Sequence, residues 1–253
     1  MSTPSAVFLA WQDSESRTWF PIARLSCSAE GLYRFVYTGG FEDARRQAGL
    51  TPLIGFPDER QVYESTELFP LFKNRIMSRS REEYKSYVTR LDLPEEGPAL
   101  SLLARSAGRR STDSFEIFPH PLVQGPAGKA RYMIDFFVHG IRHMPASAAQ
   151  RAVRLKAQER LLLMPDAQNP EDPHAVALRT EDKVLLGYVP RYYCADLEAL
   201  RQNHAEAIVS VVRVNPEPAP VQQRVLVHLD APWTALTPPF NQAQYQPIAA
   251  LAA

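Results

Sequence analysis

A stretch rich in proline and glycine divides this chain into two sets of short apolar segments. It contains Pro119, Pro121, Gly125, Pro126 and Gly128, and such residues surround polar gaps between domains. A chain of 253 residues can hold two small domains. We therefore expect a first domain at residues 1–122, a linker at 123–130 and a second domain at 131–232. An irregular, uncharged tail at 233–253 would lie over the second domain.

The first domain mixes strand and helix patterns. Alternating apolar residues predict strands at 7–11, 19–25 and 31–37, with Tyr33, Phe35 and Tyr37 on one face. Helical spacing predicts helices at 41–48, 69–77, 82–91 and 99–107, the first ended by Gly49. The basic run 73–81 includes only four charged residues and is followed by Glu82 and Glu83. We interpret it as a solvated connection rather than as a phosphate-binding patch.

The second domain is richer in strands. Patterns typical of strands occupy residues 132–138, 160–164, 175–178, 184–189, 208–214 and 221–229, and helices are expected at 146–155 and 193–202. Several short strands in about a hundred residues favour a small, curled sheet. The expected fold class is α+β, with two small domains, of which the second is a barrel-like (OB-like) β-sheet with short helices.

Charge and cysteine content exclude several classes of protein. Lys and Arg number 28, as do Asp and Glu, so the chain lacks the excess positive charge of proteins that coat nucleic acid. Cys27 and Cys194 lie too far apart for a zinc motif or a disulfide framework, which fits a reducing compartment. No signal peptide and no apolar stretch of membrane-spanning length is evident. We expect a cytoplasmic protein without cofactor or bound metal.

The most informative motif runs from Asp166 to His174 and opens into an apolar strand. Asn169 and Asp172 are suited to building a tight turn, because Asx side chains accept hydrogen bonds from nearby backbone amides beside proline. The same residues could instead contact a ligand. The acidic groups around them, together with His174, could also form an oxygen-rich metal site.

The second domain resembles a HIRAN domain over most of residues 132–230. The resemblance is carried by Gly140-Ile-Arg142-His143, by Asn169-Pro-Glu171-Asp172-x-His-Ala-Val, and by Gly187-Tyr188-Val-Pro-Arg191. It implies capture of a single-stranded DNA 3′ end in a pocket of the barrel. The implied nucleic-acid-binding residues are Arg142, His143, Asn169, Glu171, Asp172, Tyr188 and Arg191.

The chemistry of these residues suits such a ligand. Asp172 or Asn169 could accept a hydrogen bond from a 3′ hydroxyl, and Arg142 or Arg191 could bind the adjoining phosphate. His143 and Glu171 stand where end-binding members of the family carry stacking tyrosines. A histidine ring can stack on a base, whereas a glutamate cannot and repels phosphate. Arg142 could equally pair with Glu171 or Asp172 as an ordinary surface arginine.

The first domain is similar to the N-terminal subdomain of HipA-type kinases. The similarity is carried by residues 22–25, 31–37 and 68–74, with a helix ending in glycine at 102–108. It implies an interaction role. The chain has no Gly-rich phosphate loop and no catalytic Asp with a downstream Asn, so a kinase core is not expected.

These features leave three functional hypotheses. The first is a nucleic-acid-binding module that recognises single-stranded DNA or DNA 3′ ends. The second is a non-catalytic adaptor related to toxin–antitoxin or defence systems, with a protein partner that could bind through residues 1–122. The third is a metal-dependent hydrolase or nuclease, for which no catalytic constellation is evident.

Overall fold

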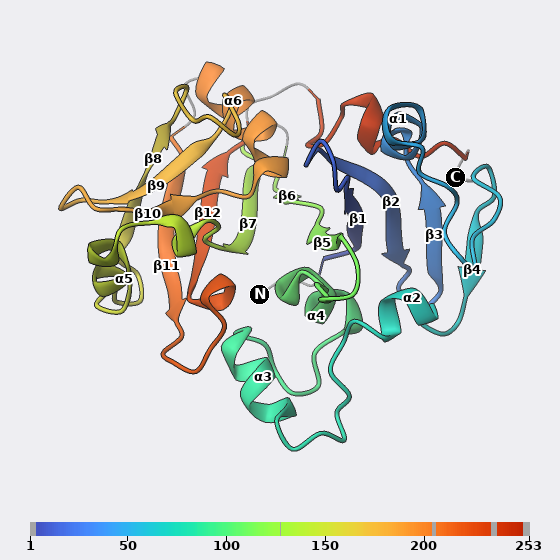
Figure 1. Cartoon of the computed structure of the whole chain (residues 1–253), viewed down its shortest axis with the longest axis horizontal. Coiled ribbons are helices and arrows are strands. Elements are labelled where there is room, and N and C mark those ends of the chain that lie inside the picture. The colour runs from blue at the N-terminus through green and yellow to red at the C-terminus, as the bar shows by residue number, and fades with distance from the viewer. Residues whose placement is uncertain (1–3, 127, 204–205, 234–236, 250–253) are drawn as a thin grey trace. The chain divides into compact units, whose positions relative to one another are not determined.

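The computed structural model describes residues 4–126, 128–203, 206–233 and 237–249. These residues form two compact units, each built on its own sheet (Figure 1). The first unit contains the described residues of 1–89, 93–120 and 240–253, and the second contains those of 90–92 and 121–239. In sequence, the second unit is therefore inserted into the first.

The first unit is built on a five-stranded sheet with the order β4-β3-β2-β1-β5, and all of its neighbouring strands are antiparallel. The strands predicted at 7–11, 19–25 and 31–37 are confirmed, but β4 and β5 were not predicted. The prolines around β5 suggested a linker, yet proline is tolerated in an edge strand. The strands are β1 (Ala6–Gln12), β2 (Trp19–Cys27), β3 (Tyr33–Tyr37), β4 (Tyr63–Ser65) and β5 (Phe115–Pro119).

Short helices connect these strands. The first ends where predicted, because Gly49 adopts a left-handed conformation with φ of 67°. The helix predicted at 69–77 is shorter, since only Pro70–Lys73 is helical. The helices are α1 (Gly39–Ala48), α2 (Pro70–Lys73), α3 (Tyr84–Arg90), α4 (Ala99–Ser106) and the short η4 (Ala243–Tyr245).

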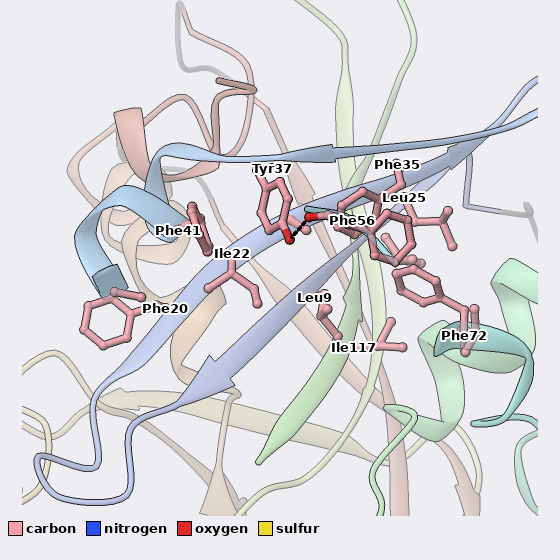
Figure 2. Close-up of a cluster of buried hydrophobic side chains, with 14 of the residues drawn as sticks. Leu9, Phe20, Ile22, Leu25, Phe35, Tyr37, Phe41, Phe56, Phe72 and Ile117 are labelled. Atoms are coloured by element: carbon pink, nitrogen blue, oxygen red, sulfur yellow. Dashed lines mark hydrogen bonds between the residues drawn. The ribbon is translucent and has the colours of Figure 1, made fainter. Parts of the chain in front are cut away.

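Aromatic rings dominate the core on one face of this sheet, as the alternation of β3 predicted. Phe35 stacks on Phe56 with ring centroids 3.8 Å apart and meets Tyr37 edge to face at 5.2 Å. Figure 2 shows the cluster around them and the hydrogen bond that the buried Tyr37 hydroxyl donates to the Phe56 carbonyl, 2.8 Å long. The same hydroxyl accepts the Leu53 amide at 2.7 Å. Tyr37 therefore fixes the loop after α1 against the sheet.

The opposite face of the sheet is covered by the C-terminal segment. The Phe240 and Tyr245 rings each meet Phe8 of β1 edge to face, with centroids 5.4 Å apart. The Gly39 amide donates a hydrogen bond to the backbone carbonyl of Gln246 at 2.9 Å. The prediction that the tail lies over the second domain is therefore wrong for the described residues from 240 on. The apolar face of β1 is what these rings cover, and the tail's own residues could not reveal it.

The basic run at 73–81 is not wholly solvated, which corrects a second prediction. The Arg75 side chain is only 2% exposed and pairs with Asp113 at 2.6 Å. It also donates to the Gly108 carbonyl at 2.9 Å. A buried guanidinium needs such partners to offset its lost hydration. Its acceptors lie more than thirty residues away in sequence, so the local pattern gave no sign of them.

The second unit is built on a seven-stranded antiparallel sheet with the order β10-β9-β8-β11-β12-β7-β6. The predicted linker at 123–130 is partly wrong, because residues 123 and 124 belong to β6, which pairs with β7. The predicted strand at 221–229 begins only at Val225. The strands are β6 (Leu122–Gln124), β7 (Arg131–Phe137), β8 (Arg160–Pro165), β9 (Val176–Thr180), β10 (Leu185–Tyr188), β11 (Ile208–Val214) and β12 (Val225–Pro232).

This sheet curls so that one end approaches the continuation of β7. His139, two residues after β7, forms an antiparallel bridge with Tyr188 of β10. Within the described ranges no strand ladder closes the sheet, so the expected barrel is not a closed one. The helices, close to those predicted, are α5 (Ala146–Ala152) and α6 (Cys194–Gln202), with short turns η1 (Ile141–His143), η2 (Arg191–Tyr193) and η3 (Val221–Gln223). None of the described helices is long and apolar enough to cross a membrane.

We predict that Phe240→Ala destabilises the first unit, although position 240 follows the whole second unit in sequence. The ring is 2% exposed, and removing a buried phenylalanine costs about 3–5 kcal/mol. Urea unfolding measures the loss. Ile54→Ala is the control, because Ile54 is fully exposed. Equal stability of the two variants would contradict the assignment of the tail to the first unit.

Candidate nucleic-acid interface

The three motifs singled out in the sequence meet at Tyr188. Its backbone exchanges two hydrogen bonds with His139, each 2.9 Å long, which join the end of β10 to the residue before Gly140. Both neighbouring glycines allow this approach. A Cβ on Gly187 would lie 2.3 Å from the His139 carbonyl oxygen, which is too close. Gly140 has a φ of 74°, and a Cβ there would lie 3.3 Å from the Tyr188 ring, a tight contact. The glycines of two motifs therefore serve the same contact.

The Tyr188 side chain ties β10 to the polar turn before β9. Its hydroxyl donates to the Asp166 carboxylate at 2.9 Å. Partial burial raises the pKa of Tyr188, and the bond to Asp166 raises it further. The phenol therefore stays protonated at neutral pH and remains a donor. Asp166 was considered only as a metal ligand in the sequence, and its role as an acceptor depends on a residue twenty-two positions later.

Asn169 and Asp172 build the turn, as their residue types predicted. The Asn169 side-chain oxygen accepts the amides of Glu171 at 3.0 Å and Asp172 at 3.2 Å. Asp172 then accepts the His174 amide at 2.9 Å. These local bonds fix the backbone between β8 and β9 and leave the Glu171 side chain exposed to solvent.

Asp172 also positions Arg191. The Arg191 Nε lies 3.2 Å from Asp172 Oδ2, with side-chain exposures of 41% and 19%. Arg191 Nη2 donates to the Glu171 carbonyl at 3.1 Å. A guanidinium has five N–H donors, and among the described residues no acceptor meets its Nη1. Arg191, and not Arg142, is thus the partner of Asp172, and it retains donors for a ligand.

Arg142 and His143 lie apart from this network, on the short turn η1. Both side chains are exposed, and Arg142 Nε donates to His143 Nε2 at 2.9 Å. η1 packs against β10, the strand that carries Tyr188. The Asp166 carboxylate accepts both the Tyr188 hydroxyl and the Asn169 side-chain amide, the latter at 3.3 Å. The structure therefore joins Asn169, Glu171, Asp172, Tyr188 and Arg191 in one hydrogen-bonded network. Arg142 and His143 form a separate hydrogen-bonded pair on η1.

The acidic groups of the turn do not form a metal site here. Nowhere in the described ranges do three or more His, Cys, Asp or Glu side chains gather so that they could hold a metal ion. Cys194, which follows η2, is buried, and that burial raises the pKa of its thiol to about 11. Cys194 is therefore a protonated, packed side chain at neutral pH rather than a nucleophile.

We predict that Asn169→Ala loosens the turn, because two backbone amides lose their acceptor. Each such bond contributes about 1 kcal/mol. Hydrogen–deuterium exchange should become faster at the amides of Glu171 and Asp172. Glu171→Ala provides the matched control, because no described residue bonds its carboxylate. If both variants exchange as slowly as the wild type, the side-chain bonds of Asn169 do not hold this turn.

Comparison with known proteins gives a family match within the second unit, which carries the three motifs. Residues 131–230 match the family model of the HIRAN domain. A crystal structure of a protein from Lactobacillus plantarum is similar at 20% identity, over 40% of this chain and 96% of that one, with a TM-score of 0.32. The HIRAN domain of human HLTF is similar at 16% identity, over 44% of this chain and 77% of that one, with a TM-score of 0.29. None of the curated proteins matches. The likeness of residues 1–122 to HipA-type kinases stays a prediction, whereas the chain carries a HIRAN domain at residues 131–230.

Proposed function

We propose that the second unit is a nucleic-acid-binding module that recognises single-stranded DNA, and DNA 3′ ends in particular. The observation that carries the proposal is the network that holds Arg191 beside Asp172, within residues that match the HIRAN domain. Capture of a 3′ end is the activity that the HIRAN resemblance implies. The site would comprise the network and the Arg142–His143 pair.

Arg191 is the better-oriented phosphate ligand. Two of its nitrogens are held by Asp172 and by the Glu171 carbonyl, so the guanidinium needs little further ordering on binding, and its Nη1 can still donate. Charge-assisted bonds from guanidinium to phosphate are short and strong. The exposed Arg142 would add a second, more mobile cation.

Asp172 is the better acceptor for a 3′ hydroxyl. The Asn169 oxygen already accepts two amides, which uses both of its lone pairs. The Asp172 carboxylate has about four acceptor sites, of which the His174 amide and Arg191 use two. Asn169 would therefore act through the turn rather than by touching the ligand.

The base would need a flat surface, and His143 supplies one on η1. Imidazole rings stack on unpaired bases. The exposed carboxylate of Glu171 repels phosphate, so the strand would have to approach from the side of η1 and Arg191. This arrangement favours binding of an end, where one nucleotide has a single phosphate neighbour.

We predict that the double variant Arg142→Ala/Arg191→Ala weakens binding of fluorescein-labelled single-stranded DNA by about tenfold or more, since bonds to charged groups contribute about 1.5–3 kcal/mol each. The salt dependence should also fall, by about 0.7 in the slope of log K against log salt for each lost phosphate contact. Fluorescence anisotropy measures both. The control is Arg60→Ala, at an exposed arginine of the first unit, which should change neither the affinity nor the salt dependence. Unaltered affinity in the double variant would refute the proposal that this site binds DNA.

A second comparison tests recognition of the end itself. We expect the wild-type chain to bind an oligonucleotide with a 3′ hydroxyl more tightly than the same oligonucleotide with a 3′ phosphate, because a phosphate beside Asp172 is repelled and has no hydroxyl to donate. Equal affinity for both oligonucleotides would leave single-strand binding but refute end recognition.

The charge pattern of the second unit favours one other candidate, a protein-binding adaptor. Its 12 Lys and Arg residues equal its 12 Asp and Glu residues over 131–230, and many are paired, as in Arg131 with Asp230 at 2.8 Å and Arg213 with Asp92 at 2.7 Å. Such pairing leaves little excess field to attract DNA. A stoichiometric protein partner, together with no DNA binding at low salt, would support the adaptor.

A further inference from the structure

Three exposed apolar side chains lie on one face of the second sheet. Leu162 and Met164 of β8 are 39% and 38% exposed, and Ile208 of β11 is 39% exposed. Their neighbours Leu161 and Val209 are buried. Successive residues of a strand point to opposite faces, so the three exposed side chains share the outer face of the sheet.

The strand register brings these side chains together. Val209 pairs with Leu161 and Ser210 with Arg160, so the next pair in this register is Ile208 with Leu162. On its other side Leu162 pairs with Arg179 of β9. Directly opposed residues on one face contact each other. Leu162, Met164, Arg179 and Ile208 therefore form a continuous surface, which we call the outer strip.

The outer strip leads toward the candidate site. Met164 pairs with Ala177 of β9, and Ala177 pairs with Tyr188 of β10. Met164 and Tyr188 thus belong to one row of paired residues. The row crosses three neighbouring strands, β8, β9 and β10, which Figure 1 shows side by side. A ligand held beside Tyr188 could extend along this row to the outer strip.

Two arginines lie at the outer strip. Arg179 stands within it, and its Nε is buried without a hydrogen-bond partner among the described residues. Arg160, in the adjacent row of the same face, has a side chain 56% exposed and only a long contact of 3.7 Å to Glu206. Apolar side chains can pack against bases, and guanidinium groups beside them can donate hydrogen bonds to phosphates or stack on bases, which suits a single strand.

We infer that the outer strip binds the nucleotides that precede the captured 3′ end, so that affinity grows with strand length. This inference rests on the proposed function. A protein partner fits less well, because a stable protein interface buries about 800 Å² on each side, and three side chains that are each about two-fifths exposed supply far less apolar surface.

The test compares labelled oligothymidylates of 3 and 12 nucleotides, both with a 3′ hydroxyl, on the full chain. Leu162→Thr/Met164→Thr keeps β-favouring side chains but removes the apolar surface. We expect the double variant to bind the 12-mer about tenfold more weakly than wild type, because it loses apolar surface that the bases would cover, and to bind the 3-mer unchanged. Val153→Thr, at a valine 55% exposed near α5, is the control. Matching thermal unfolding curves verify folding.

The outcomes distinguish failure of the outer strip alone from failure of the proposed function. If wild type binds both oligonucleotides and the double variant binds the 12-mer equally well, the outer strip is not a nucleic-acid surface, but the proposed function stands. If wild type binds neither, both proposals fail. Light scattering could also show that the wild type is an oligomer and the double variant a monomer, with no change in 12-mer affinity. That result would assign the outer strip to protein contacts instead.

Discussion

The organisation of the HIRAN domain depends on the contacts of Tyr188. Its two backbone bonds to His139 hold the end of β10 against the continuation of β7, and its hydroxyl bonds Asp166 at the start of the polar turn. Three segments that are far apart in sequence thereby acquire fixed relative positions. Because Gly187 and Gly140 flank this contact without side chains, the backbones can approach closely. Any substitution that separates β10 from His139 would also displace the turn and Arg191.

The electrostatics of the site follow from the same arrangement. The domain is neutral in formal charge, yet it does not neutralise each cation equally. Arg191 is held by Asp172 and a carbonyl, and no acceptor among the described residues meets its Nη1, whereas Arg142 donates to an imidazole nitrogen of His143. Local geometry can thus expose cationic donors on a surface whose net charge would not attract nucleic acid from a distance. Such a site would bind a defined end or a short strand rather than coat a duplex.

The first unit shows how sequence order and compactness can differ. Its sheet has an aromatic core on one face and the C-terminal segment on the other, so residues that precede and follow the HIRAN domain belong to one folded body. The apolar face of β1 would be exposed without Phe240 and Tyr245. Stability of the first unit therefore requires the chain to continue past the second, and the two cannot be separated by a single cut.

Much of this organisation was determined by the sequence alone, because its causes are local. Alternation predicted β1, β2 and β3, Gly49 predicted the end of α1, and the Asx side chains at 169 and 172 predicted a turn built on nearby amides. The HIRAN motifs likewise predicted a domain over residues 132–230, and the family match covers residues 131–230. In each case the decisive interaction lies within a few residues of the pattern that reveals it.

Only the tertiary structure decided the long-range partners. Asp172 could have paired with either arginine, and the position of η2 selects Arg191. Arg75 is buried because Asp113 and Gly108 lie beside it, and the tail packs on β1 because that face is apolar. The outer strip likewise exists only through the register of β8, β9 and β11. The physical reason is common to all four: burial and ion pairing depend on which surfaces meet, and a local pattern records only one of the two surfaces.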